Sequence, residues 1–127
     1  MTDDFGETGQ MRNALLPGRV GLFVRLASNP GGRTGVLDAL HRYADRLSSE
    51  PNTEAFVIAL DPDDEDVVWL YEWFTDEAGL EAHRLSEPFT ELVSEIPDLL
   101  ASPPGLLRID PPRLHMQTAM LDDSTVE

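Results

Sequence analysis

The sequence predicts one α+β domain in which an antiparallel sheet carries both of its helices on one face. Segments with strand-like alternation and segments with helix-like spacing follow one another in the order strand, helix, strand, strand, helix, strand. A length of 127 residues with 41% hydrophobic residues suits a single hydrophobic core. This element order is typical of the split βαβ, ferredoxin-like pattern.

The first strand and the first helix are predicted from their periodicities. Residues 18–27 alternate, with Val20 and Val24 on one face and Phe23 and Arg25 on the other. After a turn rich in Gly and Pro, Thr34 is expected to cap a helix that runs to about residue 48. Its apolar residues recur every three or four positions, so one side of this helix should pack on the sheet.

The remaining elements follow from similar signals. Residues 53–60 and 67–74 read as two strands joined by the acidic loop 61–66. Thr75 is expected to cap a second helix, which restarts near Ser86. A last strand over 106–116 contains the prolines of an Asp-Pro-Pro sequence, so it should lie at an edge or carry a bulge. We therefore divide the chain into a loose N-terminal arm (1–17), a domain (18–116) and an acidic C-terminal tail (117–127).

The charge and the missing residue types exclude several classes of function. A formal charge of −15 disfavours binding to nucleic acid and to anionic membranes. The absence of cysteine excludes thiolate nucleophiles and iron–sulfur clusters, and the absence of lysine excludes Schiff-base chemistry. The first ten residues are acidic and polar, unlike a signal peptide, and no apolar run is long enough for a membrane span. We therefore expect a cytoplasmic protein.

The three clearest predicted strands are apolar on both faces, which predicts assembly. In 67–74 the aromatic residues Trp69, Tyr71 and Trp73 alternate with Val68, Leu70 and Phe74. Two helices can cover only one face of a four-stranded sheet, so the other face would expose a large apolar patch. A homodimer formed sheet to sheet would cover it.

The segment from residue 67 to residue 89 holds the richest set of candidate functional residues. Trp69, Tyr71 and Trp73 on one strand face would form a flat wall for a planar aromatic ligand, or else belong to the core or to a dimer interface. Glu72, on the opposite strand face, should be paired, because an unpaired buried charge is costly. His83 is the best general-base candidate, although a lone histidine is more often structural.

We expect Glu72 to pair with Arg19, with Arg25 or with an arginine of a partner subunit.

No metal site is expected, because the three histidines are far apart and the acidic loop lacks the spacing of a calcium-binding loop.

Several short motifs make the sequence similar to the antibiotic biosynthesis monooxygenase (ABM) family. The run from Tyr71 to Ala78, followed by His83, Ser86 and Phe89, resembles the family's third strand and second helix. The sequence Glu-Pro-Asn-Thr at 50–53 resembles its helix-to-strand element, which usually reads Glu-Pro-Gly. The resemblance covers roughly residues 19–115.

The resemblance implies a dimeric α/β barrel and a reaction between an aromatic quinol or polyketide and O2 that needs no cofactor. A deprotonated, electron-rich phenol or enol can give an electron directly to O2, so the protein supplies a dry aromatic pocket and a base. Two catalytic residues are then implied, His83 and Trp73. The substrate-binding residues would be Trp69, Tyr71, Phe89 and Tyr43, and Glu72 would support the dimer.

Positions at which this sequence differs from the ABM pattern indicate which branches of the family it resembles least. The asparagine, tryptophan and histidine of the haem-degrading branch align with Val24, His83 and Val93, so haem degradation is not expected. Of the residues typical of anthrone oxygenases, Trp73 matches, whereas Trp69 replaces an asparagine. Quinol-monooxygenase-like members fit better. An isomerase or cyclase on the same scaffold and a non-catalytic ligand-binding accessory protein remain open as alternatives.

Overall fold

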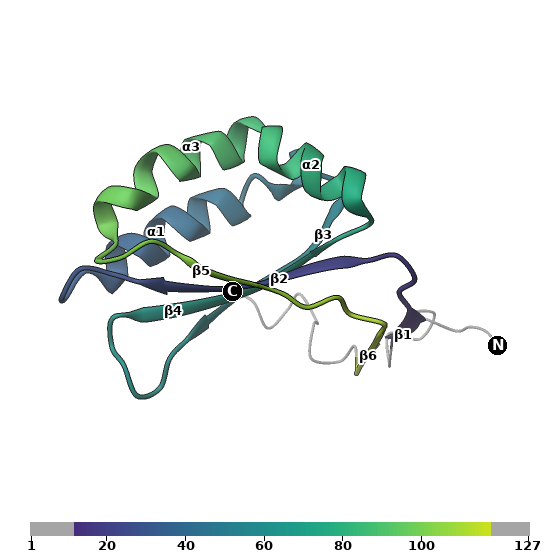
Figure 1. Cartoon of the computed structure of the whole chain (residues 1–127), viewed down its shortest axis with the longest axis horizontal. Coiled ribbons are helices and arrows are strands. Elements are labelled where there is room, and N and C mark those ends of the chain that lie inside the picture. The colour runs from purple at the N-terminus through teal and green to yellow at the C-terminus, as the bar shows by residue number, and fades with distance from the viewer. Residues whose placement is uncertain (1–11, 118–127) are drawn as a thin grey trace. The chain divides into compact units, whose positions relative to one another are not determined.

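The computed structural model describes residues 12–117, which fall into two units. The larger unit, Gly18–Asp110, contains a four-stranded antiparallel sheet in the order β3-β4-β2-β5 (Figure 1). Its strands are β2 (Val20–Ala27), β3 (Thr53–Leu60), β4 (Val67–Phe74) and β5 (Gly105–Arg108).

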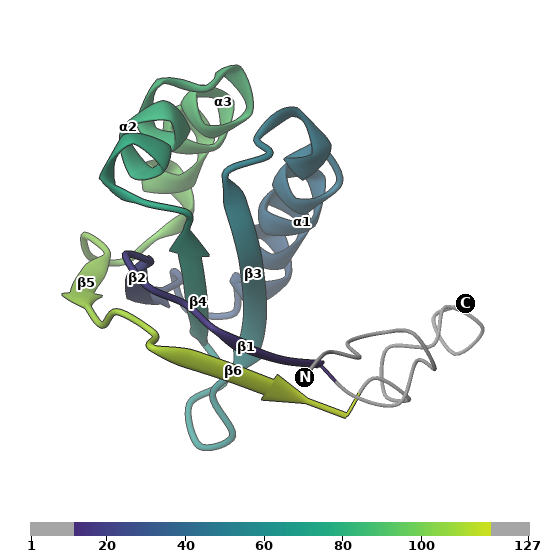
Figure 2. The same ribbon diagram turned by 90° about the vertical axis from the view of Figure 1, so that its right-hand side faces the viewer.

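All three α-helices of this unit lie on one face of the sheet (Figure 2). They are α1 (Arg33–Ala44), α2 (Glu77–Leu85) and α3 (Glu87–Glu95), accompanied by the short 3₁₀ helices η1 (Leu47–Ser49) and η2 (Ile96–Leu99). The predicted ferredoxin-like α+β fold is thereby confirmed. Among the helices within residues 12–117, none has both the length and the apolar character of a membrane span.

The helix starts differ in detail from the sequence-based expectation. Gly32, not Thr34, occupies the N-cap of α1, and the helix ends at Ala44 before η1. Asp76, not Thr75, caps α2, because its carboxylate accepts a hydrogen bond from the backbone N–H of Gly79 at 2.8 Å. A Thr hydroxyl and an Asp carboxylate can both accept the N-cap hydrogen bond, so the sequence alone did not distinguish Thr75 from Asp76.

The predicted last strand is two strands that belong to different sheets. β5 is the edge strand beside β2, whereas β6 (Arg113–Met116) pairs with β1 (Arg12–Leu15) in the smaller unit. The prolines between β5 and β6 lack the N–H groups that a continuous ladder needs. Residues 12–15, expected as part of a loose arm, therefore form a strand, while residues 1–11 and 118–127 of the predicted arm and tail lie outside the described residues.

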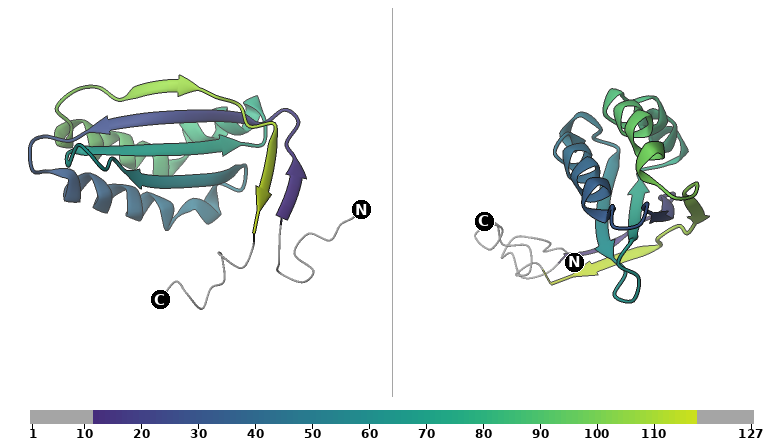
Figure 3. Two further views of the ribbon diagram at one scale, coloured as in Figure 1. Left: turned by 90° about the horizontal axis from the view of Figure 1, so that it is seen from below. Right: turned by 90° about the vertical axis from the view of Figure 1, so that its left-hand side faces the viewer.

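Strand alternation separates the two faces of the larger sheet. In β4, Val68, Leu70 and Phe74 are buried toward the helices, and so is the carboxylate-bearing Glu72. Trp69, Tyr71 and Trp73 point to the other face, which carries no helix among the described residues of this unit (Figure 3, left). The hydrophobic core therefore lies between the sheet and the helices.

Candidate functional site

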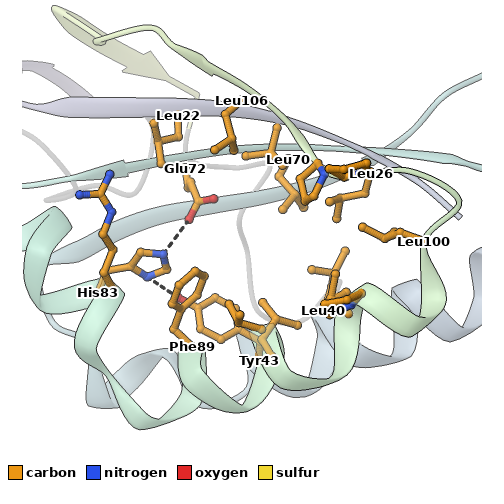
Figure 4. Close-up of a pocket in the computed structure, with 18 of the residues that line it drawn as sticks. Leu22, Leu26, Leu40, Tyr43, Leu70, Glu72, His83, Phe89, Leu100 and Leu106 are labelled. Carbon is orange, nitrogen blue, oxygen red and sulfur yellow. Dashed lines mark hydrogen bonds and ion pairs between the residues drawn. The ribbon is translucent and has the colours of Figure 1, made fainter.

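A cavity of about 850 Å³ lies between the helices and the sheet of the larger unit. This volume falls in the range of pockets that hold drug-sized ligands. Its walls are predominantly aliphatic and aromatic side chains from all four strands of the sheet, all three α-helices and the segment that leads into β5 (Figure 4). The polar side chains that line it are Tyr43, Glu72, His83, Arg84 and Ser102.

A buried carboxylate, Glu50, connects several side chains at the polar end of this cavity through hydrogen bonds. It follows η1 and accepts hydrogen bonds from the hydroxyls of Tyr43 (2.9 Å), Thr53 (2.9 Å) and Ser86 (2.6 Å). Nδ1 of His83 lies 3.0 Å from the same carboxylate and 2.9 Å from the Tyr43 hydroxyl. These bonds join α1, β3 and α2 and orient the imidazole ring.

The network sets the protonation states around His83. Burial alone would raise the pKa of Glu50, but the donors Ser86, His83, Tyr43 and Thr53 hold that pKa below its usual value. Burial lowers the pKa of His83, although the hydrogen bond to Glu50 opposes this effect. Burial and the charge of Glu50 raise the pKa of Tyr43 far above its usual range. At neutral pH the site thus contains an ionised Glu50, a neutral His83 and a protonated Tyr43.

Glu72 faces the other side of the same imidazole. Its Oε1 lies 3.9 Å from Nε2 of His83, and its side chain is 7% exposed. Burial, reinforced by the charge of Glu50, raises the pKa of Glu72 to about 7. Rings of Phe74 and Phe89 flank His83, with centroids 4.9 and 4.1 Å from that of the imidazole. An apolar cavity that ends in a neutral imidazole and a weakly acidic carboxyl group can accept and return a proton.

The sequence of the domain matches the family model described as antibiotic biosynthesis monooxygenase over residues 19–95, which is more than half of the chain. The chain belongs to this family. The match includes the Glu50 network, the aromatic strand β4 and His83. No curated protein matches the sequence.

Solved structures of other proteins share the ABM fold. One is a candidate antibiotic biosynthesis monooxygenase from Caulobacter crescentus (TM-score 0.69, 16% identity, covering 76% of this chain and 92% of the other). Another is Rv0793 from Mycobacterium tuberculosis (TM-score 0.68, 18% identity, 73% and 94% covered). A third is a Nitrosomonas europaea protein of unknown function, NE2512 (TM-score 0.63, 27% identity, 72% and 87% covered).

In this ABM domain the predicted site residues divide into two groups. Tyr43, Phe89, His83 and Glu72 line the cavity. Trp69, Tyr71 and Trp73 do not line it, because the alternation of β4 directs them to the opposite face of the sheet. The expectation that these three rings share one pocket with Phe89 is therefore not met.

The aromatic residues of the opposite face form a continuous row with Phe23. Phe23 stacks on Trp69 with ring centroids 5.2 Å apart, and Tyr71 lies 5.9 Å from Trp73. Their polar atoms bond within the unit: Trp69 Nε1 donates to Asp61, the Tyr71 hydroxyl to the carbonyl of Ile109, and Trp73 Nε1 to Glu54. The row thus presents ring surface whose polar atoms already have partners.

The predicted pairing of Glu72 with Arg19 or Arg25 is wrong. Arg19 bonds Glu54 at 2.7 Å, and Arg25 lies on the opposite face of the sheet, with its guanidinium 5.9 Å from the Trp69 ring. Glu72 faces the helices of its own chain, so it lies in the interior and not on the face open to a partner.

Glu50 was absent from the residues predicted for the site. The sequence signal that could have identified Glu50 is the Glu-Pro-Asn-Thr element. A carboxylate at a helix-to-strand junction can accept hydrogen bonds from nearby hydroxyls, and the Thr53 hydroxyl of this element is one of them. Within residues 12–117, no group of histidine and acidic side chains is arranged to hold a metal ion.

Proposed function

We propose that this ABM-family protein is a monooxygenase that oxidises an aromatic quinol or polyketide-type substrate with O2, without a metal or a flavin. The observation that carries the proposal is the apolar cavity of about 850 Å³ whose polar end is formed by His83. A planar multi-ring substrate fits such walls, and its phenol or enol hydroxyl would lie at the end of the cavity where His83 can receive its proton.

His83 is the proton acceptor in this reaction. A neutral imidazole can take a proton, and Glu50 stabilises the imidazolium that forms because its carboxylate lies 3.0 Å from Nδ1. The substrate anion then gives electrons to O2. When an activated methylene becomes a carbonyl, the substrate supplies all four electrons, one oxygen atom enters the product and the other leaves as water. Tyr43 and Phe89 contribute the aromatic wall.

The proposal includes a homodimer, in which the row of Phe23, Trp69, Tyr71 and Trp73 packs against a second copy of the chain. Val57, across the ladder from Tyr71, is 50% exposed on this face, and Leu107 is 58% exposed. Apolar surface of this extent supports an interface between subunits. In this proposal the aromatic face of β4 forms the subunit interface, whereas the cavity binds the substrate. The cytoplasmic location stays a prediction from sequence.

The test is oxygen consumption by purified protein with a panel of quinols and anthrones, in chelator-treated buffer without added flavin. We expect turnover with formation of the oxygenated product and its loss in His83→Ala. Turnover unchanged in His83→Ala would remove the base assignment. Absence of both turnover and binding across the panel would refute the monooxygenase, whereas binding without turnover would favour the accessory protein.

A second candidate, an isomerase or cyclase, is favoured by the position of Glu72 beside His83 at one end of the cavity, because these two groups can exchange protons with a substrate without O2. Anaerobic turnover distinguishes the two candidates. A monooxygenase stops when O2 is removed, whereas an isomerase continues at the same rate.

A further inference from the structure

Glu72 differs from the other carboxylate of the site in having a buried oxygen without a partner. Glu50 accepts hydrogen bonds from several surrounding groups. Within residues 12–117, Oε1 of Glu72 is buried and finds no hydrogen-bond partner. A buried polar atom without a partner costs stability, so a carboxyl group kept in an apolar wall calls for a functional explanation.

The arginines near Glu72, Arg84 and Arg108, pair with other acidic side chains. Glu50 is a like charge, and Arg84, which also lines the cavity, lies 3.6 Å from Glu81 with a side chain 56% exposed. Arg108, on the strand beyond β2, bonds Glu77 and Asp110. The group that faces Glu72 across the site is His83, 3.9 Å away, and that distance is too long for a direct hydrogen bond.

Glu50, His83 and Glu72 lie in a row in space at the polar end of the cavity, with His83 between the two carboxyl groups. Nδ1 of His83 is held by Glu50 and Tyr43, so Nε2 is the nitrogen left to exchange a proton. Figure 4 shows the carboxyl group of Glu72 extending from the sheet toward His83, at the margin of the apolar part of the cavity. A ligand in this cavity would therefore meet Glu72 beside the imidazole.

We propose that Glu72 is the residue that contacts the ligand hydroxyl and relays its proton to His83. The proposal rests on the proposed function only in requiring that the cavity bind a molecule with an acidic hydroxyl, such as a phenol or an enol. Glu72 acts as a protonated carboxyl group with one oxygen toward the ligand and the other toward His83.

The relay transfers one proton at each end and changes no oxidation state. The ligand O–H bond breaks as its proton joins the carbonyl oxygen of the Glu72 carboxyl group, and the proton on the other oxygen passes to Nε2 of His83. Glu72 remains neutral, the ligand becomes an oxyanion and His83 becomes an imidazolium paired with Glu50. A small shift of the His83 ring or of Glu72 on binding would close the 3.9 Å gap.

The relay also limits the chemical class of the ligand. Glu72 lines the polar end of the cavity and the carboxylate of Glu50 lies directly behind His83, so a carboxylate or phosphate inserted there would meet like charge. An uncharged hydroxyl meets a hydrogen-bond acceptor and donor in Glu72. We therefore expect ligands that enter this end as neutral hydroxylated rings.

The test uses 4-nitrophenol, whose absorption moves from the ultraviolet to the visible when it loses its proton. Bound to the wild-type protein, the phenol should show an apparent pKa about one unit below that of the free compound, a roughly tenfold shift toward the anion. Glu72→Gln removes the carboxyl O–H that would stabilise the phenolate after the relay, and His83→Gln removes the imidazolium that would form, so both variants should bind the probe and lose that shift. Glu91→Gln, the same change on the exposed side of α3, should keep it.

Two results would overturn the relay: ionisation of the bound phenol in Glu72→Gln equal to that in the wild type, or failure of the wild type to bind or to ionise the probe. A measurement on the wild type alone covers the case in which the variants do not fold. Its infrared spectrum should contain the C=O stretch of a protonated carboxylic acid, and this band should shift when the phenol binds. A band that is absent or insensitive to the phenol would contradict the proposal.

The proton relay and the monooxygenase can fail separately. The probe experiment is run without O2, so phenol ionisation with no oxygenation of any substrate would refute the proposed function and leave the relay standing. Oxygenation at the wild-type rate in Glu72→Gln would refute the relay and leave the monooxygenase standing.

Discussion

The imidazole of His83 lies between two carboxyl groups whose pKa values are shifted in opposite directions: Glu50, 3.0 Å from Nδ1, and Glu72, 3.9 Å from Nε2. Hydrogen bonds from surrounding side chains keep the pKa of Glu50 low, whereas burial raises that of Glu72 to about 7. His83 thus donates a hydrogen bond to an anion on one side and faces, on the other side, a carboxyl group that holds its proton up to about pH 7. This asymmetry gives the site a direction for proton transfer.

The raised pKa of Glu72 should make the free energy of unfolding depend on pH. Below its ordinary pKa of 4.5, Glu72 is protonated in both states, so its contribution is constant. As the pH rises toward 7 the folded state retains the proton longer, and the carboxyl group becomes destabilising by about 3 kcal/mol above pH 7. Glu72→Gln lacks this cost, so it should gain stability relative to the wild type between pH 4.5 and 8.

Urea unfolding of wild type and Glu72→Gln over this pH range measures that difference directly, because pH effects common to both proteins cancel. Glu91→Gln is the matched control, and its difference from the wild type should vary little with pH. A pH-independent difference between Glu72→Gln and the wild type would show that Glu72 has an ordinary pKa in the folded protein.

Replacement of Glu50 should destabilise the domain more than removal of any one of its donors. In Glu50→Gln an amide nitrogen takes the place of an acceptor oxygen and faces hydroxyl donors, which should cost about 2–3 kcal/mol. Thr53→Val removes one donor and should cost about 1 kcal/mol. Urea unfolding at neutral pH gives both values; equal losses would contradict a central role for Glu50.

The same Glu50→Gln variant should lower the pKa of His83 further, because the charge that favours the imidazolium is lost. The ¹⁵N and ¹H shifts of the His83 ring, followed by NMR over pH, provide the measurement. A rise in the pKa of His83 would show that another group, not Glu50, stabilises its charged form.

A larger side chain at the rim of the cavity should block ligand entry without unfolding the domain. Leu106 lines the cavity and is 67% exposed on β5, so Leu106→Trp can be accommodated while its indole covers the opening. We expect binding of 2-naphthol, followed by fluorescence, to weaken about tenfold or more. Leu85→Trp, at an exposed position on α2 outside the cavity, should bind as the wild type does. Equal binding by both variants would place the ligand elsewhere.

A charge on the aromatic face should dissociate the proposed dimer. Val57→Asp introduces a carboxylate at a half-exposed position of β3, where it costs little in a monomer but would be desolvated in a sheet-to-sheet interface. Sedimentation velocity should show a dimer for the wild type and a monomer for Val57→Asp. Leu85→Asp, on the helical side, should remain dimeric; a monomeric wild type would refute the interface.

Much of the fold could be predicted because it depends on local periodicity. The period-two alternation of residues 67–74 correctly placed Trp69 and Glu72 on opposite faces, and the chain order β2, α1, β3, β4, α2, α3, β5 confirms the predicted order of strands and helices. The choice between adjacent caps such as Thr75 and Asp76 could not be made, because either side chain can accept the same backbone hydrogen bond. The pairing of residues 12–15 with 113–116 joins opposite ends of the chain, and no local pattern specifies it.

The site was only partly predictable for the same reason. His83, Tyr43 and Phe89 could be selected by residue type and helical spacing, but the face that bears the cavity depends on where the helices pack. The aromatic residues Trp69, Tyr71 and Trp73 suggested that their face of β4 lines the ligand pocket. The helices instead cover the opposite face of the sheet and enclose the cavity there.

The sequence by itself determined the order of the elements, the two faces of each strand and the family to which the chain belongs, since these depend on residue spacing and short motifs. Only the tertiary structure decided that Glu50, Glu72 and His83 meet at one end of an apolar cavity. These residues come from a helix-to-strand junction, a strand and a helix, and packing brings them together. Burial at that meeting point sets their protonation states, because desolvation and neighbouring charge arise only when the elements are assembled.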